Sequence, residues 1–250
     1  MVTRGSSPRC SLGSEASSQR KAAIAQQKYH KCGMVRAPAA FDSWSMKIAL
    51  FGGTGNVGRV LLGMTLDAGH EVTLLAGDPG TVGRQHPLLT VIKGNALDPD
   101  AVDKTLVGAE AVLSTLGGFG DADSIETGTA NILAAMPAAG VKRLVVVQGF
   151  HLRFPGDPDN LGRRIVNVYL KARDRNLVPR SHAMATQLRT TTDLDWTLLR
   201  IPAVVPGGPT GHTKVGTLRL GPWSKVTAGD VSATVLDLLE EQRPYARPRW

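Results

Sequence analysis

Three glycines, Gly52, Gly55 and Gly58, follow an apolar run at residues 48–51 in the segment KIALFGGTGNVG. A turn without side chains lets the backbone come close to a pyrophosphate group, whose negative charge then lies at the N-terminus of the next helix. A glycine triplet alone is weak evidence for such a site. The elements on either side therefore decide what the triplet means.

The flanking residues have the periodicity that such a site requires. Val57, Val60, Leu61 and Met64 recur at helical spacing, Gly69 ends that helix, and residues 71–75 are typical of a strand. Strand, glycine turn, helix and strand within about thirty residues form a dinucleotide-binding βαβ unit. This context disfavours the alternative, a glycine-rich turn that binds nothing.

Composition limits the classes of protein that remain. The chain has 250 residues, of which 42% are apolar, enough for one large α/β domain. Its net charge is +8, but residues 1–45 hold seven cations against two acids, so the folded remainder carries only +3. Without a stripe of Lys and Arg among aromatics, no nucleic-acid partner is expected. Without an apolar run of about 18 residues, no membrane partner is expected.

Both cysteines, Cys10 and Cys32, lie in the first 45 residues. The rest of the chain therefore has no disulfide framework, cysteine metal site or thiol chemistry, and we expect no metal. A cytoplasmic, reducing compartment is the natural expectation.

Residues 1–45 are rich in Ser, Arg, Lys, Gln and Ala, and we expect a disordered or dispensable extension. Met46 directly precedes the first strand, which favours a start at Met46, and we expect no core residue before Lys47. The alternatives are a transit peptide and, more weakly, a basic tail that contacts nucleic acid.

Strands and helices alternate after the βαβ unit. We expect helices at 98–107, after a capping box of Asp123 and Glu126, over 161–191 with a break near Pro179, and at 230–241 with Asp230 as cap. The remaining strands are expected at 90–93, 111–115, 143–147 and 195–199. Repeated βα units predict an α/β fold with a doubly wound parallel sheet (Rossmann) and a single domain over residues 46–250.

The chain resembles the atypical short-chain dehydrogenase/reductases of the NmrA-like NAD(P)H-binding family, and within it the biliverdin reductase B / flavin reductase type. The resemblance covers nearly all of residues 46–241. It is carried by the segments KIALFGGTGNVG, EVTLLAGDP, VIKGNALDPDAV, AVLSTLGG, NILAAMPAAGVKRLVVVQGF, TDLDWTLLRIPAVV and SKVTAGDVSATVLDLLE.

The resemblance implies which residues hold the cofactor. It assigns the pyrophosphate to Gly52, Thr54, Gly55, Asn56, Val57 and Gly58. It assigns the adenine to Asn95, Ala96 and Leu97, and the middle of the cofactor to Leu116, Gly117 and Gly118. It assigns the nicotinamide to Val147, Gln148, Gly149, Pro202, Ala203 and Val204.

The chain departs from that pattern where chemistry would occur. The flavin reductase type has Ser at the position of Gly149 and His at the position of Ala203. The Tyr-x-x-x-Lys pair of typical short-chain dehydrogenases is also missing, because Tyr169 precedes Lys171 by two residues and the two would not share a helix face.

The ribose-reading position falls about 20 residues past the glycines, at Gly77 and Asp78. The family commonly has Arg where this chain has Gly77, so Arg84 or Arg59 would have to hold a 2′-phosphate. Asp78 could instead read a 2′-hydroxyl, or be a turn residue before Pro79. The resemblance favours NADP, with NAD as the alternative.

Gln148, His151 and Tyr169 are the catalytic candidates. Gln148 has the best position, at the carboxyl end of a strand. The alternative for His151 is an exposed loop histidine, and for Tyr169 helix packing.

The predicted function is NAD(P)H-dependent reduction of a flavin, quinone or related conjugated acceptor, because such rings accept hydride without a dedicated acid. The alternative is a non-catalytic, NAD(P)-sensing regulator. A non-redox epimerase is disfavoured by the missing Tyr/Lys pair. We expect a small-molecule substrate and a monomer or homodimer.

Overall fold

The computed structural model describes residues 45–119, 121–154, 157, 160–216 and 220–240. The extension expected over residues 1–45 therefore lies outside the described residues except for Ser45. Met46 is buried, and its N–H donates to Nδ1 of His70 at 3.2 Å. The expectation that the core begins only at Lys47 is thus wrong by one residue.

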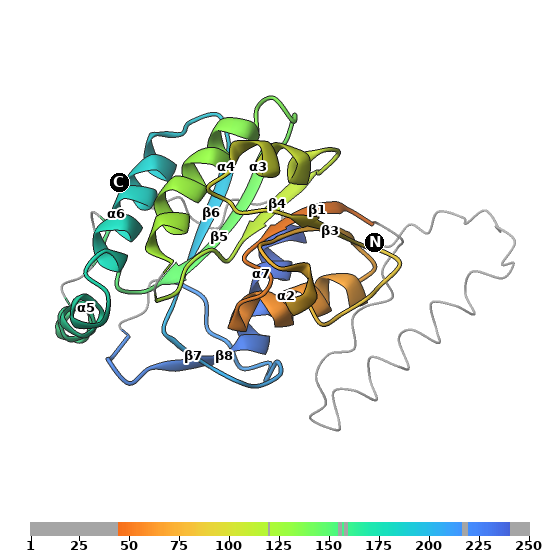
Figure 1. Ribbon diagram of the computed structural model, residues 1–250. Coiled ribbons are helices and arrows are strands. Elements are labelled where there is room, and N and C mark those ends of the chain that lie inside the picture. Colours follow the sequence, from red (N-terminus) through yellow and green to blue (C-terminus); the bar gives the residue numbers. More distant parts are fainter. Residues whose placement is uncertain (1–44, 120, 155–156, 158–159, 217–219, 241–250) are drawn as a thin grey trace, which may run out of the picture. The chain divides into compact units, whose positions relative to one another are not determined.

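Six parallel strands form one sheet in the order β3-β2-β1-β4-β5-β6 (Figure 1). The strands are β1 (Lys47–Phe51), β2 (Glu71–Ala76), β3 (Leu89–Lys93), β4 (Ala111–Ser114), β5 (Arg143–Gly149) and β6 (Asp195–Ile201). Two short parallel strands, β7 (Ala203–Val205) and β8 (Lys225–Thr227), pair separately. The doubly wound sheet predicted from the sequence is confirmed.

Helices cover both faces of the sheet (Figure 1). They are α2 (Asn56–Asp67), α3 (Pro99–Leu106), α4 (Thr129–Ala135), α5 (Leu161–Arg173), α6 (Leu177–Thr190) and α7 (Ala228–Glu240). Leucines of α2 and α7 pack on one face of β1, and residues of α3, α4 and α6 pack on the other. None of the described helices is long and apolar enough to cross a membrane.

The strand order changes direction between β1 and β4, because the chain builds β2 and β3 on one side of β1 and β4 to β6 on the other. At such a point the loops after neighbouring strands run apart and leave a crevice. The loops that follow β1 and β4 lie side by side there, and they contain six of the residues assigned to the cofactor, Gly52, Thr54, Gly55, Leu116, Gly117 and Gly118.

Two predicted helix caps are wrong. Asp123 is itself helical and makes no capping bond; it and Glu126 instead bind Arg180 of α6, beside a π-helical turn at Ser124–Gly128. At α7, the Thr227 hydroxyl accepts the N–H of Asp230, so Thr227 is the cap. Spacing along the chain predicted these caps. In the structure, Arg180 binds the carboxylates of Asp123 and Glu126, and Thr210 donates to the carboxylate of Asp230.

The helical segment 161–191 breaks at Asp174–Asn176 rather than at Pro179. Pro179 lies in the first turn of α6, where its missing N–H costs nothing.

Candidate functional site

The glycine turn after β1 is held by close backbone contacts. Gly52 has φ +80°, and a Cβ there would lie 2.7 Å from the carbonyl carbon of Thr115. A Cβ on Gly58 would lie 2.1 Å from the carbonyl oxygen of Gly52, so α2 can approach the turn only without a side chain. Gly55 differs, because a Cβ there would meet only that oxygen, at 3.4 Å. The space beside Gly55 is thus open on the side where α2 begins.

The N-terminus of α2 fits a bound pyrophosphate. No side chain caps this helix, and its first turn has no acidic residue. Its first N–H groups therefore remain available to a negatively charged ligand. Thr54, Asn56 and Val57 lie in or next to this turn, as the sequence predicted.

The polar residues near the ribose position are mostly engaged elsewhere. Oδ1 of Asp78 accepts the N–H of Gly80 at 2.9 Å and caps a short 3-10 turn at Pro79–Thr81. Arg84 binds Asp67, at the far end of α2, at 2.5 Å. Arg59 lies beside the glycine turn, where its Nε donates to the carbonyl of Thr54 at 2.7 Å. Arg59 is therefore the better placed of the two arginines to meet a 2′-phosphate.

The loop assigned to the adenine has an internally bonded backbone. Oδ1 of Asn95 accepts the N–H of Leu97 at 3.0 Å, and the carbonyl of Ala96 accepts from Asn131 at 2.9 Å. The NH₂ group of Asn95 and the second lone pair of its Oδ1 are thus left to contact a base.

Gln148 lies at the carboxyl end of β5, facing the loop that follows β4. Its Oε1 accepts the N–H of Gly149, while its Nε2 is buried without a partner among the described residues. That Nε2 lies 3.7 Å from where a Cβ on Gly117 would be. A buried donor without a partner is costly unless a ligand accepts from it. Gln148 and residues 116–118 therefore fit the cofactor stretch assigned to them.

The interpretation of His151 as an exposed loop histidine is wrong. After β5 the loop stays against β6, where the N–H of Phe150 donates to the carbonyl of Ile201 at 2.8 Å and Arg200 donates to the carbonyl of Leu152. This buries His151 to 3% exposure and places its Nδ1 2.5 Å from where a Cβ on Gly149 would be. The imidazole thus fills the space that a side chain at position 149 would occupy. A polar group is present at this point of the site after all.

The His151 imidazole is uncharged at neutral pH. Burial, with a smaller contribution from the charge of nearby His182, lowers the pKa of His151 from 6.5 to about 4. Burial and the charge of Lys171 lower the pKa of His182 in turn. His151 can therefore donate one hydrogen bond but has no excess proton to give.

The sequence reasoning missed Asn167, which precedes Lys171 by four residues and shares its face of α5. Its Nδ2 donates to the carbonyl of His151 at 3.3 Å, and its Oδ1 is buried without a partner among the described residues. The sequence contained a signal for this residue, because Asn167 stands at the Tyr position of the Tyr-x-x-x-Lys spacing when Lys171 is taken as the Lys. Tyr169 lies on the outer side of α5, 57% exposed, and the structure does not bring it together with His151.

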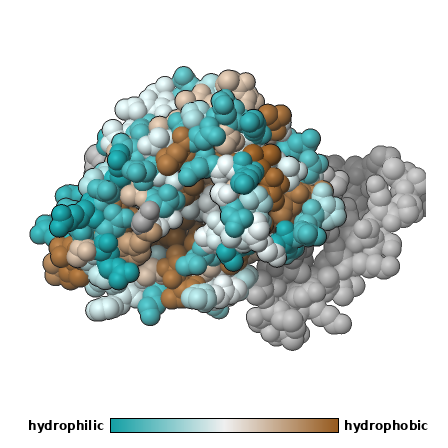
Figure 2. All heavy atoms as spheres, viewed as in Figure 1, coloured by the Kyte–Doolittle hydropathy of each residue, from teal (hydrophilic) through white to brown (hydrophobic). Residues whose placement is uncertain are grey.

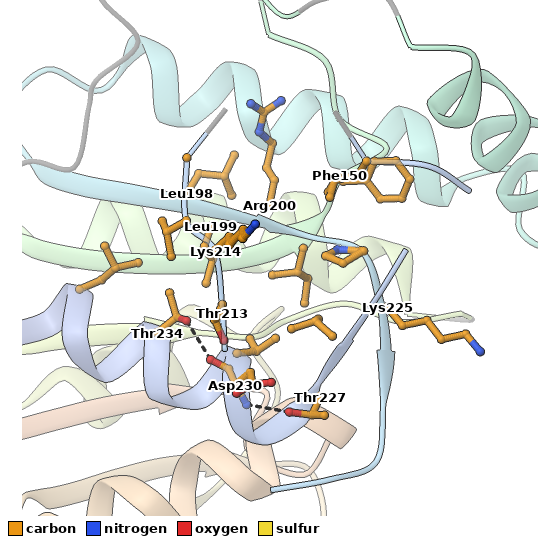
Figure 3. A pocket seen from close by; sticks show the side chains of 18 of the residues that line it. Phe150, Leu198, Leu199, Arg200, Thr213, Lys214, Lys225, Thr227, Asp230 and Thr234 are labelled. Atoms are coloured by element: carbon orange, nitrogen blue, oxygen red, sulfur yellow. Dashed lines mark hydrogen bonds between the residues drawn. The ribbon is translucent and has the colours of Figure 1, made fainter. Parts of the chain in front are cut away.

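A cavity of about 630 Å³ adjoins the carboxyl ends of β5 and β6 (Figure 3). Apolar side chains from β6 and α7 form much of its wall, and Phe150 and Pro202, which directly follow β5 and β6, also line it. Ala203 and Val204, in contrast, form strand β7. The glycine- and proline-rich segment 201–224 contributes a large share of the lining.

A compact ion cluster braces this cavity. Asp157 accepts from both Arg200 and Arg163, and the side chains of Asp157 and Arg163 are only about a tenth exposed. Arg200 also lies 5.0 Å from the centre of the Phe154 ring. Bonds to the two arginines outweigh burial and lower the pKa of Asp157. The loop after β5 is thus fastened to β6 and to α5.

Comparison with known proteins supports the Rossmann fold and NAD(P)H as the ligand. A family profile described as NAD(P)H-binding matches residues 52–242. Two solved structures share the fold: ChuY, an anaerobillin reductase from Escherichia coli O157:H7 (TM-score 0.63, 20% identity, 78% of this chain and 91% of that one), and a wide-type short-chain dehydrogenase/reductase from Veillonella parvula in complex with NADP (TM-score 0.62, 18% identity, 80% and 90%).

One relative is similar in sequence over part of the chain. It is the (4-alkanoyl-5-oxo-2,5-dihydrofuran-3-yl)methyl phosphate reductase of Streptomyces griseus, 32% identical over 117 residues. The match spans 47% of this chain and 39% of that protein's length.

Proposed function

Because the chain belongs to the NAD(P)H-binding family, we propose that it is a reductase that transfers hydride from NADPH to a conjugated acceptor, such as a flavin, quinone or related ring. The observation that carries this proposal is the neutral, buried His151 beside Gly149. Among Gln148, His151 and Asn167, none carries an acidic proton near pH 7. These three side chains supply hydrogen-bond donors but no strong acid.

The residues of the proposed site have two roles, which are to bind the cofactor and to orient the acceptor. Bound NADPH would supply the hydride. The open turn at Gly55 and the uncapped α2 would hold the pyrophosphate, and Nε2 of Gln148 would donate to the nicotinamide end. The cavity walls would hold the acceptor ring and exclude water, which favours hydride transfer through proximity.

The acceptor class follows from charge. A simple ketone develops alkoxide charge as hydride arrives, and an acid or oxyanion donor must meet that charge. A conjugated ring spreads the charge over its own atoms, and water can supply the proton. The Streptomyces relative is named as a reductase of a 5-oxo-2,5-dihydrofuran, a ring whose carbonyl is conjugated to a double bond, which supports the proposal.

We propose NADPH rather than NADH because Arg59 lies at the glycine turn. Asp78 offers less support for NADH, because its Oδ1 already accepts from Gly80 in a turn. Replacing Arg59 by Ala should raise the Kd for NADPH about tenfold and leave that for NADH nearly unchanged. An equal loss for both nucleotides would remove Arg59 from this role.

The test of turnover is NADPH oxidation with a panel of flavins, quinones and unsaturated lactones. Oxidation that depends on the acceptor supports the reductase. Tight NADPH binding with no oxidation by any acceptor would instead support a nucleotide-sensing regulator. The absence of polar side chains at Gly149 and Ala203 also favours this alternative.

A further inference from the structure

Helix α5 has two different faces. Arg163 and Asn167 point inward, to Asp157 and to the carbonyl of His151. The outer face carries large apolar side chains that no other described element covers. Their exposed fractions are 71% for Leu161, 51% for Ile165, 70% for Val168 and 57% for Tyr169.

These four residues form one stripe, because spacings of four, seven and eight residues return to the same side of a helix. The stripe continues beyond the N-terminal end of α5. Gly162 packs against Pro222, since a Cβ there would lie 2.9 Å from the proline Cδ, and the next residue, Trp223, is 87% exposed. We call Leu161, Ile165, Val168, Tyr169 and Trp223 the α5 face. Figure 2 shows apolar surface at its lower left edge, where Figure 1 places α5.

Cations border the α5 face. At 3.6 residues per turn, Arg164 and Lys171 lie on one side of the stripe and Arg173 on the other. The helix sequence, LGRRIVNVYLKAR, contains no Asp or Glu. An apolar stripe with cations on both sides and an exposed Trp is typical of helices that lie in the surface of an anionic membrane.

A second copy of the chain fits this face less well. Two copies meeting through α5 would bring the cations of both helices together without an acidic residue on either helix. The helix is also only about 20 Å long, short for an interface that needs about 800 Å² from each partner. An anionic lipid surface attracts positively charged side chains and accepts an apolar stripe.

We infer that the α5 face docks on the surface of an anionic lipid bilayer. A helix lying in the interface needs no membrane-spanning segment, so the expectation of no membrane partner, which rested on the absence of such a segment, does not bear on it.

The α5 face also lies next to the cavity. Asn160, Arg163 and Leu220 line the cavity, and Nδ2 of Asn160 donates to the carbonyl of Leu220 at 2.7 Å. The N-terminal end of α5 and the segment 220–223 therefore join the docking surface to the cavity wall. An apolar acceptor dissolved in the membrane would reach the site from this side. Only this last step rests on the proposed reductase function.

The test compares two matched substitutions in the full chain. Val168→Glu changes the α5 face, and Val107→Glu makes the same change at a valine after α3 that is 77% exposed. Both are measured by co-sedimentation with phosphatidylcholine vesicles, with and without phosphatidylglycerol. Because both variants keep the basic residues 1–45, any binding through that segment is equal in the two.

We expect the Val107→Glu variant to bind vesicles that contain phosphatidylglycerol like the unchanged protein. We expect the Val168→Glu variant to bind about tenfold more weakly, with unchanged affinity for NADPH. Equal vesicle binding by the two variants would overturn the inference. So would binding of the unchanged protein to phosphatidylcholine vesicles as strong as its binding to vesicles that contain phosphatidylglycerol. A concentration-dependent dimer that Val168→Glu abolishes, without vesicle binding, would show that a second copy covers the face. Since the measurement involves no turnover, its outcome is independent of the proposed reaction.

Discussion

The cofactor end and the acceptor end of this molecule are built in opposite ways. At the cofactor end, β1 and β4 are almost wholly buried, and the glycine turn is fixed by backbone atoms in close contact. At the acceptor end, six of the seven residues of β6 are only partly buried, and a cavity of about 630 Å³ lies alongside the strand.

The two ends also differ in how many buried polar atoms lack a partner. Among the described residues, Nε2 of Gln148, Nε2 of His151 and Oδ1 of Asn167 have none, whereas on β1 and β4 this holds for Oγ of Ser114 alone. Such groups lower stability unless a ligand satisfies them. If the proposed function holds, the rigid end would bind the cofactor, and the other end would give up stability in order to hold the acceptor.

The largest expected effect is at the rigid end. Gly55→Val should abolish measurable NADPH binding, because its side chain would occupy the open space at the start of α2, while the fold survives. Gly208→Val is the matched control, since a Cβ there meets nothing within 4 Å, and one on Gly55 meets only the oxygen of Gly52, at 3.4 Å. Calorimetry and circular dichroism give the two readouts. Unchanged affinity in the Gly55 variant would show that the turn has another use.

The rigid end could be predicted from the sequence, and the acceptor end only in part. The glycine spacing and the apolar runs are local signals, and they predicted β1, α2 and the strand alternation. The burial of His151 depends on how the loop after β5 folds, and the bonds of Arg200 to Asp157 and to the carbonyl of Leu152 join residues 43 and 48 positions apart. Spacing within one element does not contain that information.

A second prediction concerns the stability of the folded protein at low pH, which depends on His151 at the acceptor end. The pKa of His151 is about 4 in the folded protein and 6.5 in the reference state, so the unfolded chain binds the proton more tightly. The free energy of unfolding should be constant above about pH 6.5 and fall as the pH drops, with His151 accounting for about 3 kcal/mol by pH 4.

His70, His182 and Asp157 also have lowered pKa values and act in the same direction. His151→Gln isolates the histidine in urea titrations at pH 7 and pH 4. The substitution should reduce the loss of stability between these two values. An unchanged loss would mean that His151 is not buried in the neutral form.

A smaller effect is expected on turnover. His151→Ala should lower kcat for a conjugated acceptor by less than about tenfold, or about 1.4 kcal/mol in the barrier, because water supplies the proton. Over pH 6 to 9 the titration of His151 should leave kcat unchanged, since its pKa lies near 4. A thousandfold loss of kcat would make His151 the missing acid.

The smallest effect is expected from removing residues 1–45. The cut leaves Met46 in the core and loses the bond from the Ser45 hydroxyl to the carbonyl of Gly69, which is worth about 1 kcal/mol or less. The melting temperature and the Kd for NADPH should stay nearly the same. A fall of several degrees would show that this segment supports the domain.

The central claim is that the acceptor end orients a conjugated ring without an acid. The most direct measurement is the ratio of kcat/KM for a flavin or quinone to that for an unconjugated ketone of similar size, with NADPH as donor. The account predicts a ratio of at least about a hundredfold, the usual value of one oxyanion donor. Equally efficient reduction of the unconjugated ketone would contradict it.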